Sequence, residues 1–143
     1  MSDAVFDYDV LIVGTGNAAC SAALAAVEKT PHVGMLEKAP QRDRGGNSML
    51  TVLMRFAFNG AEDLKPLIRN YSDDEMRPLL EGLPHRTEAE LWDEIMRVTN
   101  NQSDQDMLQV HVTESLKTVH WLASKGHDWS PATIRDDNVV TMN

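Results

Sequence analysis

The sequence lacks several features that mark particular classes of protein. One cysteine among 143 residues excludes an internal disulfide. No run of basic residues occurs and the net charge is −9, which argues against nucleic acid or an anionic membrane surface as a partner. The longest apolar stretch, residues 10–27, is interrupted by two glycines and an asparagine, so it is too short and too polar to span a bilayer.

Signals for export, metal binding and internal repeats are also absent. The N-terminus carries Asp3, Asp7 and Asp9 where a secretory signal would be basic, and together with the single cysteine this favours a cytoplasmic location. The five histidines have no metal-ligand spacing with cysteines or acids, so no metal site is predicted. With 42% apolar and 24% charged residues, the composition is that of an ordinary globular protein.

The N-terminal quarter has the pattern of a βαβ unit. An apolar strand over residues 8–13 leads into a Gly-x-Gly-x-x-Ala turn, then an alanine-rich helix over 17–29 and a second strand over 33–37. The nearly continuous apolar first strand is typical of a parallel sheet that is covered on both faces. The pattern predicts an α/β fold with a Rossmann-like parallel sheet.

Each part of this turn has a role in holding a dinucleotide. Gly14 allows the tight turn, Gly16 leaves room for a pyrophosphate, and Ala19 lets the helix lie close to the sheet. The helix N-terminus directs free N–H groups at the phosphates. Glu37 ends the second strand, where an acid accepts hydrogen bonds from ribose hydroxyls and repels a 2′-phosphate, which favours FAD or NAD over NADP. The alternative is a plain βαβ unit whose glycines only form a turn, which leaves Glu37 unexplained.

The rest of the chain divides into irregular and helical segments. Residues 38–59 begin with an exposed, irregular loop, while residues 49–58 are apolar without a clean period and receive no assignment. Residues 61–71 are predicted to be a short helix and residues 72–86 an acidic connecting loop. We therefore expect a βαβ unit with its loop over residues 1–59 and a helical segment over residues 60–143.

Two longer helices are predicted after residue 86. Thr87 and Glu90 have the spacing of a capping box, which precedes an apolar stripe of Leu91, Trp92, Ile95 and Met96. Residues 103–106 repeat this start signal in weaker form. The next apolar residues recur at helical spacing until Lys125 and Gly126, namely Leu108, Val112, Leu116, Val119 and Ala123.

The fingerprint is followed by a second group of glycines and polar residues. Glu37-Lys38-Ala39-Pro40 is followed by Gly45-Gly46-Asn47-Ser48, and then by Thr51 and Arg55. These segments resemble the N-terminal part of the FAD-dependent fumarate reductase/succinate dehydrogenase flavoprotein family, in particular its tricarballylate dehydrogenase branch. The resemblance resumes at Tyr71-Ser72 and covers nearly the whole chain.

The resemblance implies an FAD site and a set of residues that line it. The pyrophosphate of FAD would contact the glycine turn at residues 14–19, and the ribose would contact Glu37. The flavin half would contact the polar residues after the double glycine. In the succinate dehydrogenase branch a histidine carries the flavin covalently, but Leu50 stands at that place, so non-covalent FAD is expected. The expected cofactor-binding residues are Gly14, Gly16, Asn17, Ala18, Ala19, Glu37, Lys38, Gly45, Gly46, Asn47, Ser48 and Thr51.

The resemblance also implies an activity. It is dehydrogenation or reduction of a carbon–carbon bond in a di- or tricarboxylate, with an electron-transfer partner that reoxidises the flavin. Members of this family are several times longer than this chain, and their substrate-binding and proton-transfer residues lie downstream. We therefore expect an N-terminal part of the enzyme, with an incomplete domain and no turnover alone, and we assign no catalytic residue.

Three alternatives stay open. One is an NAD-dependent dehydrogenase that uses the same fingerprint, although the second glycine pair suits an extended FAD better. Another is a non-catalytic dinucleotide-binding remnant. The third concerns Arg55, which either approaches a substrate carboxylate or the flavin, or forms a surface salt bridge or a helix-cap contact.

Overall fold

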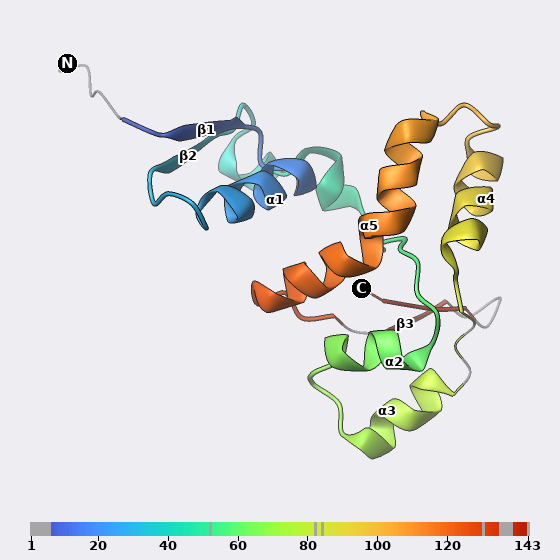
Figure 1. The fold of residues 1–143 in the computed structure, drawn as a ribbon. Coiled ribbons are helices and arrows are strands. Elements are labelled where there is room, and N and C mark those ends of the chain that lie inside the picture. Colours follow the sequence, from blue (N-terminus) through green and yellow to red (C-terminus); the bar gives the residue numbers. More distant parts are fainter. Residues whose placement is uncertain are drawn as a thin grey trace. The chain divides into compact units, whose positions relative to one another are not determined.

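The chain is mixed α/β, and its N-terminal elements have the predicted order (Figure 1). The computed structural model describes residues 7–51, 53–81, 83, 85–129, 131–134 and 139–142. The chain divides into two units, Met1–Val52 and Leu53–Asn143. The division lies before the boundary expected at residues 59 and 60.

In the first unit, two parallel strands flank one helix in sequence. β1 (Val10–Val13) pairs with β2 (Val33–Leu36), with Val10 opposite Val33 and Val13 opposite Leu36. α1 (Asn17–Ala26) connects them and ends three residues before the predicted end at residue 29. The prediction of an α/β fold with a parallel strand pair is confirmed.

Within the described residues, α1 covers one face of this two-stranded sheet. Along β1, Val10 and Ile12 are half-buried, whereas Leu11 and Val13 are 52% and 82% exposed. The alternation arises because α1 packs against a single face (Figure 1) and successive strand residues point to opposite faces. The buried hydrophobic side chains of the described residues all belong to the second unit.

Two short 3-10 helices follow β2 within the predicted loop. η1 spans Gln41–Asp43 and η2 spans Gly46–Leu50. Gly45, which precedes η2, has a φ of +107°, and Gly46 has a φ of +56°. Both values lie in the left-handed region, where glycine is favoured because it has no Cβ. The double glycine therefore forms the sharp entry to η2.

The second unit has two core clusters that share one extended segment. Phe56 and Phe58 pack into a cluster with α2 (Ala61–Leu64), η3 (Lys65–Leu67) and α3 (Asp73–Leu80). Ala57, between them, packs into the second cluster with Leu91. This alternation is the two-residue period of extended backbone.

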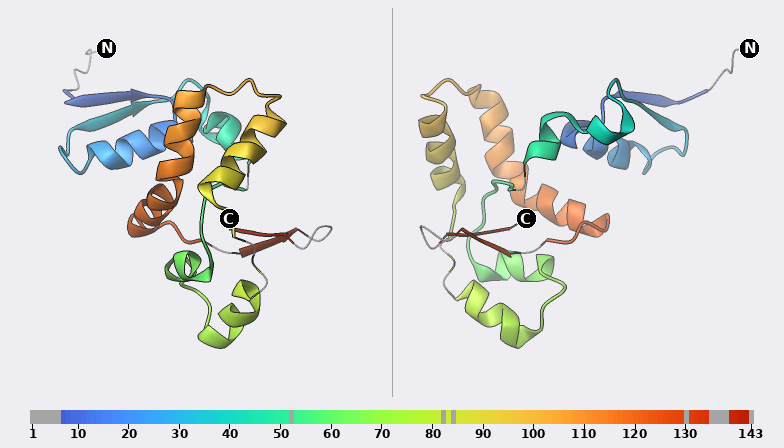
Figure 2. Two further views of the ribbon diagram at one scale, coloured as in Figure 1. Left: turned by 45° about the vertical axis from the view of Figure 1, so that its right-hand side comes forward. Right: turned by 180° about the vertical axis from the view of Figure 1, so that it is seen from behind.

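The last two helices supply further members of both clusters, and Ile68 and Trp129 complete the first cluster. α4 (Glu88–Val98) and α5 (Gln105–Ser124) lie side by side in both views of Figure 2. The predicted capping box is confirmed, since Thr87 Oγ1 accepts the N–H of Glu90 at 3.2 Å and the Glu90 carboxylate accepts the N–H of Thr87 at 2.8 Å. The predicted face of α5 is confirmed at Leu108, Val112, Val119 and Ala123, whereas Leu116 is only half-buried and Ser115, which was not predicted, is buried.

The prediction of an acidic loop over residues 72–86 is wrong, because α3 occupies Asp73–Leu80. Ser72 and Glu75 form a capping box, in which the Glu75 carboxylate accepts the N–H of Ser72 at 2.9 Å. The acidic residues that suggested a loop form the first turn, where negative charge is favourable. Pro78 lies inside the helix and removes only one of its hydrogen bonds.

Two further differences concern element lengths and strands. The helix predicted over 61–71 is shorter, because α2 and η3 together end at Leu67. β3 (Pro131–Ile134) and β4 (Val139–Met142), which were not expected from the sequence, form an antiparallel pair. In the described part of the chain, no helix combines the length and apolar character needed to cross a membrane.

Candidate functional site

The turn between β1 and α1 requires a glycine. Gly14 has a φ of +104°, a conformation that L side chains rarely adopt. Its N–H donates to the carbonyl oxygen of Leu36 at 2.6 Å, so the carboxyl ends of β1 and β2 lie side by side. A Cβ on Gly14 would have space, since the nearest atom, Cβ of Ala19, would be 3.9 Å away. The backbone conformation, and not crowding, therefore requires this glycine.

The N-terminus of α1 presents free backbone donors. The N-cap residue, Gly16, has no side chain to cap the helix, and the N–H of Asn17 donates to Ser48 Oγ at 2.9 Å. Among the described residues, the N–H groups of Ala18 and Ala19 have no hydrogen-bond partner. Two free N–H groups at the positive end of a helix dipole fit a phosphate group.

Gly16 is in close contact with the double-glycine loop. A Cβ at Gly16 would lie 3.2 Å from the carbonyl oxygen of Gly45 and 3.3 Å from Ser48 Oγ. These distances are tighter than ordinary van der Waals contact. The sequence pattern assigned the space beside Gly16 to a pyrophosphate. In this structure residues 45–48 of the chain itself lie close to that space.

Glu37 lies beside the fingerprint turn. One carboxylate oxygen accepts the N–H of Ala39 at 2.8 Å, and the other accepts the hydroxyl of Thr15. The hydrogen bond from Ala39, followed by the one from Thr15, lowers the pKa of Glu37 below its ordinary value. Glu37 is therefore an exposed anion that the chain holds next to the turn.

Thr15 is the site residue that the sequence analysis missed. Its hydroxyl donates to Glu37 and also accepts the N–H of Gly45 at 3.1 Å. The signal was present in the sequence, because a hydroxyl residue between the two fingerprint glycines can both donate and accept a hydrogen bond. Its two partners lie 22 and 30 residues away, so they are known only from the fold.

The other predicted site residues are on the surface. The side chains of Lys38 and Asn47 make no hydrogen bond or ion pair within the described ranges, and Gly46 has open space beside it. Thr51 Oγ1 donates to the carbonyl oxygen of Ser48 at 3.0 Å, which fixes it within its own turn. Leu50 is 80% exposed.

Arg55 belongs to the second unit and forms an ion pair there. Its guanidinium contacts Glu94, and the same carboxylate lies 3.5 Å from Nε of Arg86. Arg86 is held opposite Phe58 by two backbone hydrogen bonds of 2.7 and 2.9 Å. Burial and the neighbouring charge of Arg55 lower the pKa of Arg86. This geometry corresponds to the salt-bridge alternative for Arg55.

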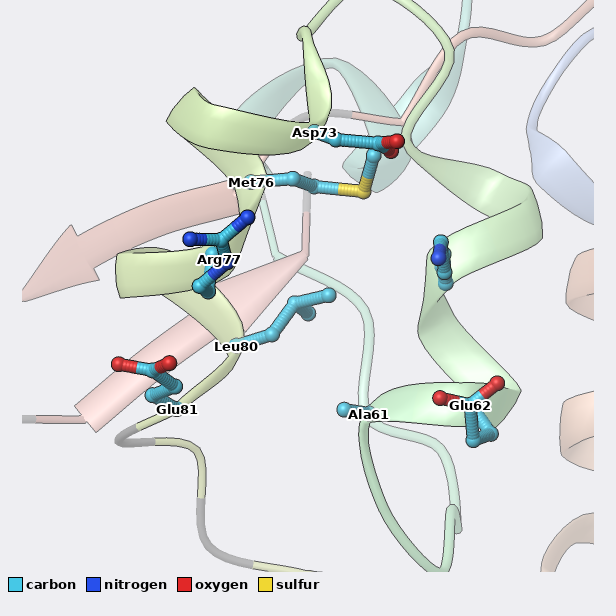
Figure 3. Close-up of a pocket in the computed structure, with 8 residues that line it drawn as sticks. Ala61, Glu62, Asp73, Met76, Arg77, Leu80 and Glu81 are labelled. Atoms are coloured by element: carbon cyan, nitrogen blue, oxygen red, sulfur yellow. The ribbon is translucent and has the colours of Figure 1, made fainter.

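The second unit contains a cavity of 310 Å³ between α2 and α3 (Figure 3). Its apolar lining consists of Ala61, Met76 and Leu80. Its charged lining consists of Glu62, Lys65, Asp73, Arg77 and Glu81. The lining therefore carries charges of both signs, three carboxylates and two cations, so it favours neither an anionic nor a cationic ligand. Among the described residues, no group of His, Cys, Asp and Glu is arranged to hold a metal ion.

Comparison with known proteins adds no assignment to this geometry. No protein-family model matches the chain, and no curated protein matches it. The candidate site is therefore defined by its own residues: the Gly14 turn, the free N–H groups of α1, Glu37 and the double-glycine loop.

Proposed function

We propose that this chain is the FAD-binding N-terminal part of an oxidoreductase of the fumarate reductase/tricarballylate dehydrogenase type. The observation that carries the proposal is the position of Glu37, an anion beside the glycine turn that leads into the free N–H groups of α1. A Rossmann-like dinucleotide site needs these three features together.

Each part of the site would bind a different part of FAD. The N–H groups of Ala18 and Ala19 would donate to the diphosphate, and Glu37 would accept hydrogen bonds from the ribose hydroxyls. Asn47 and Ser48 offer donors and acceptors to the flavin half. Leu50 has no nucleophile, so the cofactor would be held without a covalent bond.

The bound flavin would supply hydride transfer to or from a carbon–carbon bond of a small di- or tricarboxylate. Within the described residues, the role of this chain is to bind and orient the cofactor, and no residue is assigned to proton transfer. An electron-transfer partner would reoxidise the flavin. The isolated chain is expected to bind FAD weakly and to have no turnover.

Amide-resolved NMR titration tests the proposal, because it detects weak binding. FAD should shift the N–H signals of residues 15–19 and also those of residues 47–51. NAD should shift the first group only, since it lacks a flavin. If FAD leaves the signals of residues 15–19 unchanged at millimolar concentration, the proposal is wrong. If NAD shifts both groups as strongly as FAD, the NAD-dependent alternative is favoured.

Two glycine variants provide a matched pair for the same titration. Gly14→Ala forces an L residue into the left-handed region, at a cost of roughly 1–2 kcal/mol. Gly126→Ala carries the same strain, because Gly126 has a φ of +93° and open space around it, but it lies after α5. We expect Gly14→Ala to weaken FAD binding at least about tenfold and Gly126→Ala to leave it unchanged.

A further inference from the structure

One side chain, that of Thr15, joins Glu37 to the double-glycine loop of the candidate site. The hydroxyl of Thr15 donates to Glu37 and accepts the N–H of Gly45. The carbonyl of Gly45 in turn accepts the N–H of Ser48 at 3.2 Å, and Ser48 Oγ accepts the N–H of Asn17 at 2.9 Å. An uninterrupted series of hydrogen bonds thus runs from the acid to the N-terminus of α1.

We propose that Thr15 is a positioning residue, which holds the carboxylate of Glu37 and the Gly45–Ser48 loop in the arrangement that a dinucleotide requires. This inference rests on the function proposed above. Thr15 itself would not contact the cofactor. Its role is to fix two groups that would otherwise move independently.

The chemistry of threonine suits this role. Its branched Cβ restricts χ1, so its hydroxyl is held in one place. The hydroxyl has one proton and two lone pairs, so it donates to the carboxylate and accepts from the amide at the same time. Valine has nearly the same shape and provides neither interaction.

Glu37 needs such a partner because it is exposed. A free glutamate side chain samples several rotamers, and ordering it on ligand binding reduces affinity. Thr15 and Ala39 each occupy one carboxylate oxygen, and a carboxylate has about four lone-pair sites. Acceptor capacity therefore remains for ribose hydroxyls after the side chain has been fixed.

The loop needs the same partner. Gly45 has a φ of +107° and its carbonyl oxygen would be 3.2 Å from a Cβ on Gly16, so a small shift of the loop changes the space beside the fingerprint. The N–H of Gly45 is the loop's direct link to Thr15. The hydrogen bond from the N–H of Asn17 to Ser48 Oγ is a second link, between the same loop and α1.

Thr30 offers a matched control in the same unit. Its hydroxyl donates to Asp9 and accepts the N–H of His32 at 3.2 Å, so it makes the same two kinds of bond as Thr15. Neither partner belongs to the candidate site. Thr30→Val therefore removes equivalent interactions elsewhere.

The first measurement needs no ligand. In Thr15→Val, NMR titration should show the pKa of Glu37 rising part of the way toward that of an ordinary glutamate, because the hydrogen bond from Ala39 remains and the one from Thr15 is lost. Exchange of the Gly45 amide proton should become about tenfold faster. Thr15→Ser should preserve both values, and Thr30→Val should change neither. If the pKa of Glu37 and the exchange rate of the Gly45 amide proton are unchanged in both Thr15→Val and Thr15→Ala, the proposal is overturned.

The second measurement is the affinity for ADP and FAD. We expect about tenfold weaker binding in Thr15→Val, recovery in Thr15→Ser and wild-type affinity in Thr30→Val. Equal affinity in wild type and Thr15→Val overturns the positioning role. If the wild-type chain binds neither nucleotide, the proposed function fails, and the binding role of Thr15 fails with it. The ligand-free measurement separates that outcome from an error about Thr15 itself.

Discussion

Removal of the Glu94 charge tests whether Arg55 is a structural residue. Glu94→Gln keeps the shape of the side chain but leaves Arg55 and Arg86 without their shared carboxylate. Burial and the charge of Arg55 already disfavour the protonated form of Arg86. The substitution should therefore destabilise the second unit more than the loss of an exposed ion pair would.

The exposure of the three side chains sets the magnitude. Exposed ion pairs contribute about 0.2–1 kcal/mol, whereas breaking a fully buried pair costs about 3–5 kcal/mol. Arg55 is 54% exposed, but Arg86 and Glu94 are only 25% and 21% exposed. We expect Glu94→Gln to lower the free energy of unfolding by about 2 kcal/mol, between the two limits.

Urea unfolding followed by tryptophan fluorescence measures this change in the correct unit, because all three tryptophans lie between residues 92 and 129. Glu114→Gln is the control, since Glu114 pairs with Lys117 at 2.9 Å and both side chains are more than half exposed. It should cost no more than about 0.5 kcal/mol.

Two results would refute this reasoning. One is a Glu94→Gln variant that is no less stable than Glu114→Gln. The other is an unchanged unfolding free energy in Glu94→Gln and Arg55→Gln together with weaker binding of FAD. The second result would favour the alternative in which Arg55 approaches the substrate or the flavin.

Further predictions concern buried polar groups and pH. Ser115 is buried and accepts the N–H of Ala57 at 3.0 Å, so Ser115→Ala should cost about 1–3 kcal/mol in urea unfolding, whereas the exposed Thr113→Ala should cost little. Hydrogen bonds from Thr87 lower the pKa of Glu90 below that of an ordinary glutamate. Its contribution to stability is therefore present above the unfolded-state pKa and is lost as the pH falls through the lower folded-state pKa. Acid unfolding of Glu90→Gln should show a weaker pH dependence there, and an unchanged dependence would contradict this.

Local patterns could be read directly from the sequence. The βαβ order, the capping box at Thr87 and the buried face of α5 depend on residues within a few positions of one another. The same kind of signal was present at Ser72 and Glu75, where a local capping box defines α3. Pro78 and the acids before it are common in loops, but acidic residues also stabilise the first turn of a helix, which is where Asp73, Asp74 and Glu75 lie.

The arrangement of the candidate site depended on the tertiary structure. The sequence identified the glycines and Glu37 through their spacing, since a turn with positive φ and a strand-ending acid are local requirements. It did not reveal that Thr15 joins Glu37 to Gly45, that Gly16 accommodates the chain's own loop, or that Arg55 pairs with Glu94. These contacts span 22 to 39 residues, and their distances are set by how strands and helices pack and not by any period along the chain.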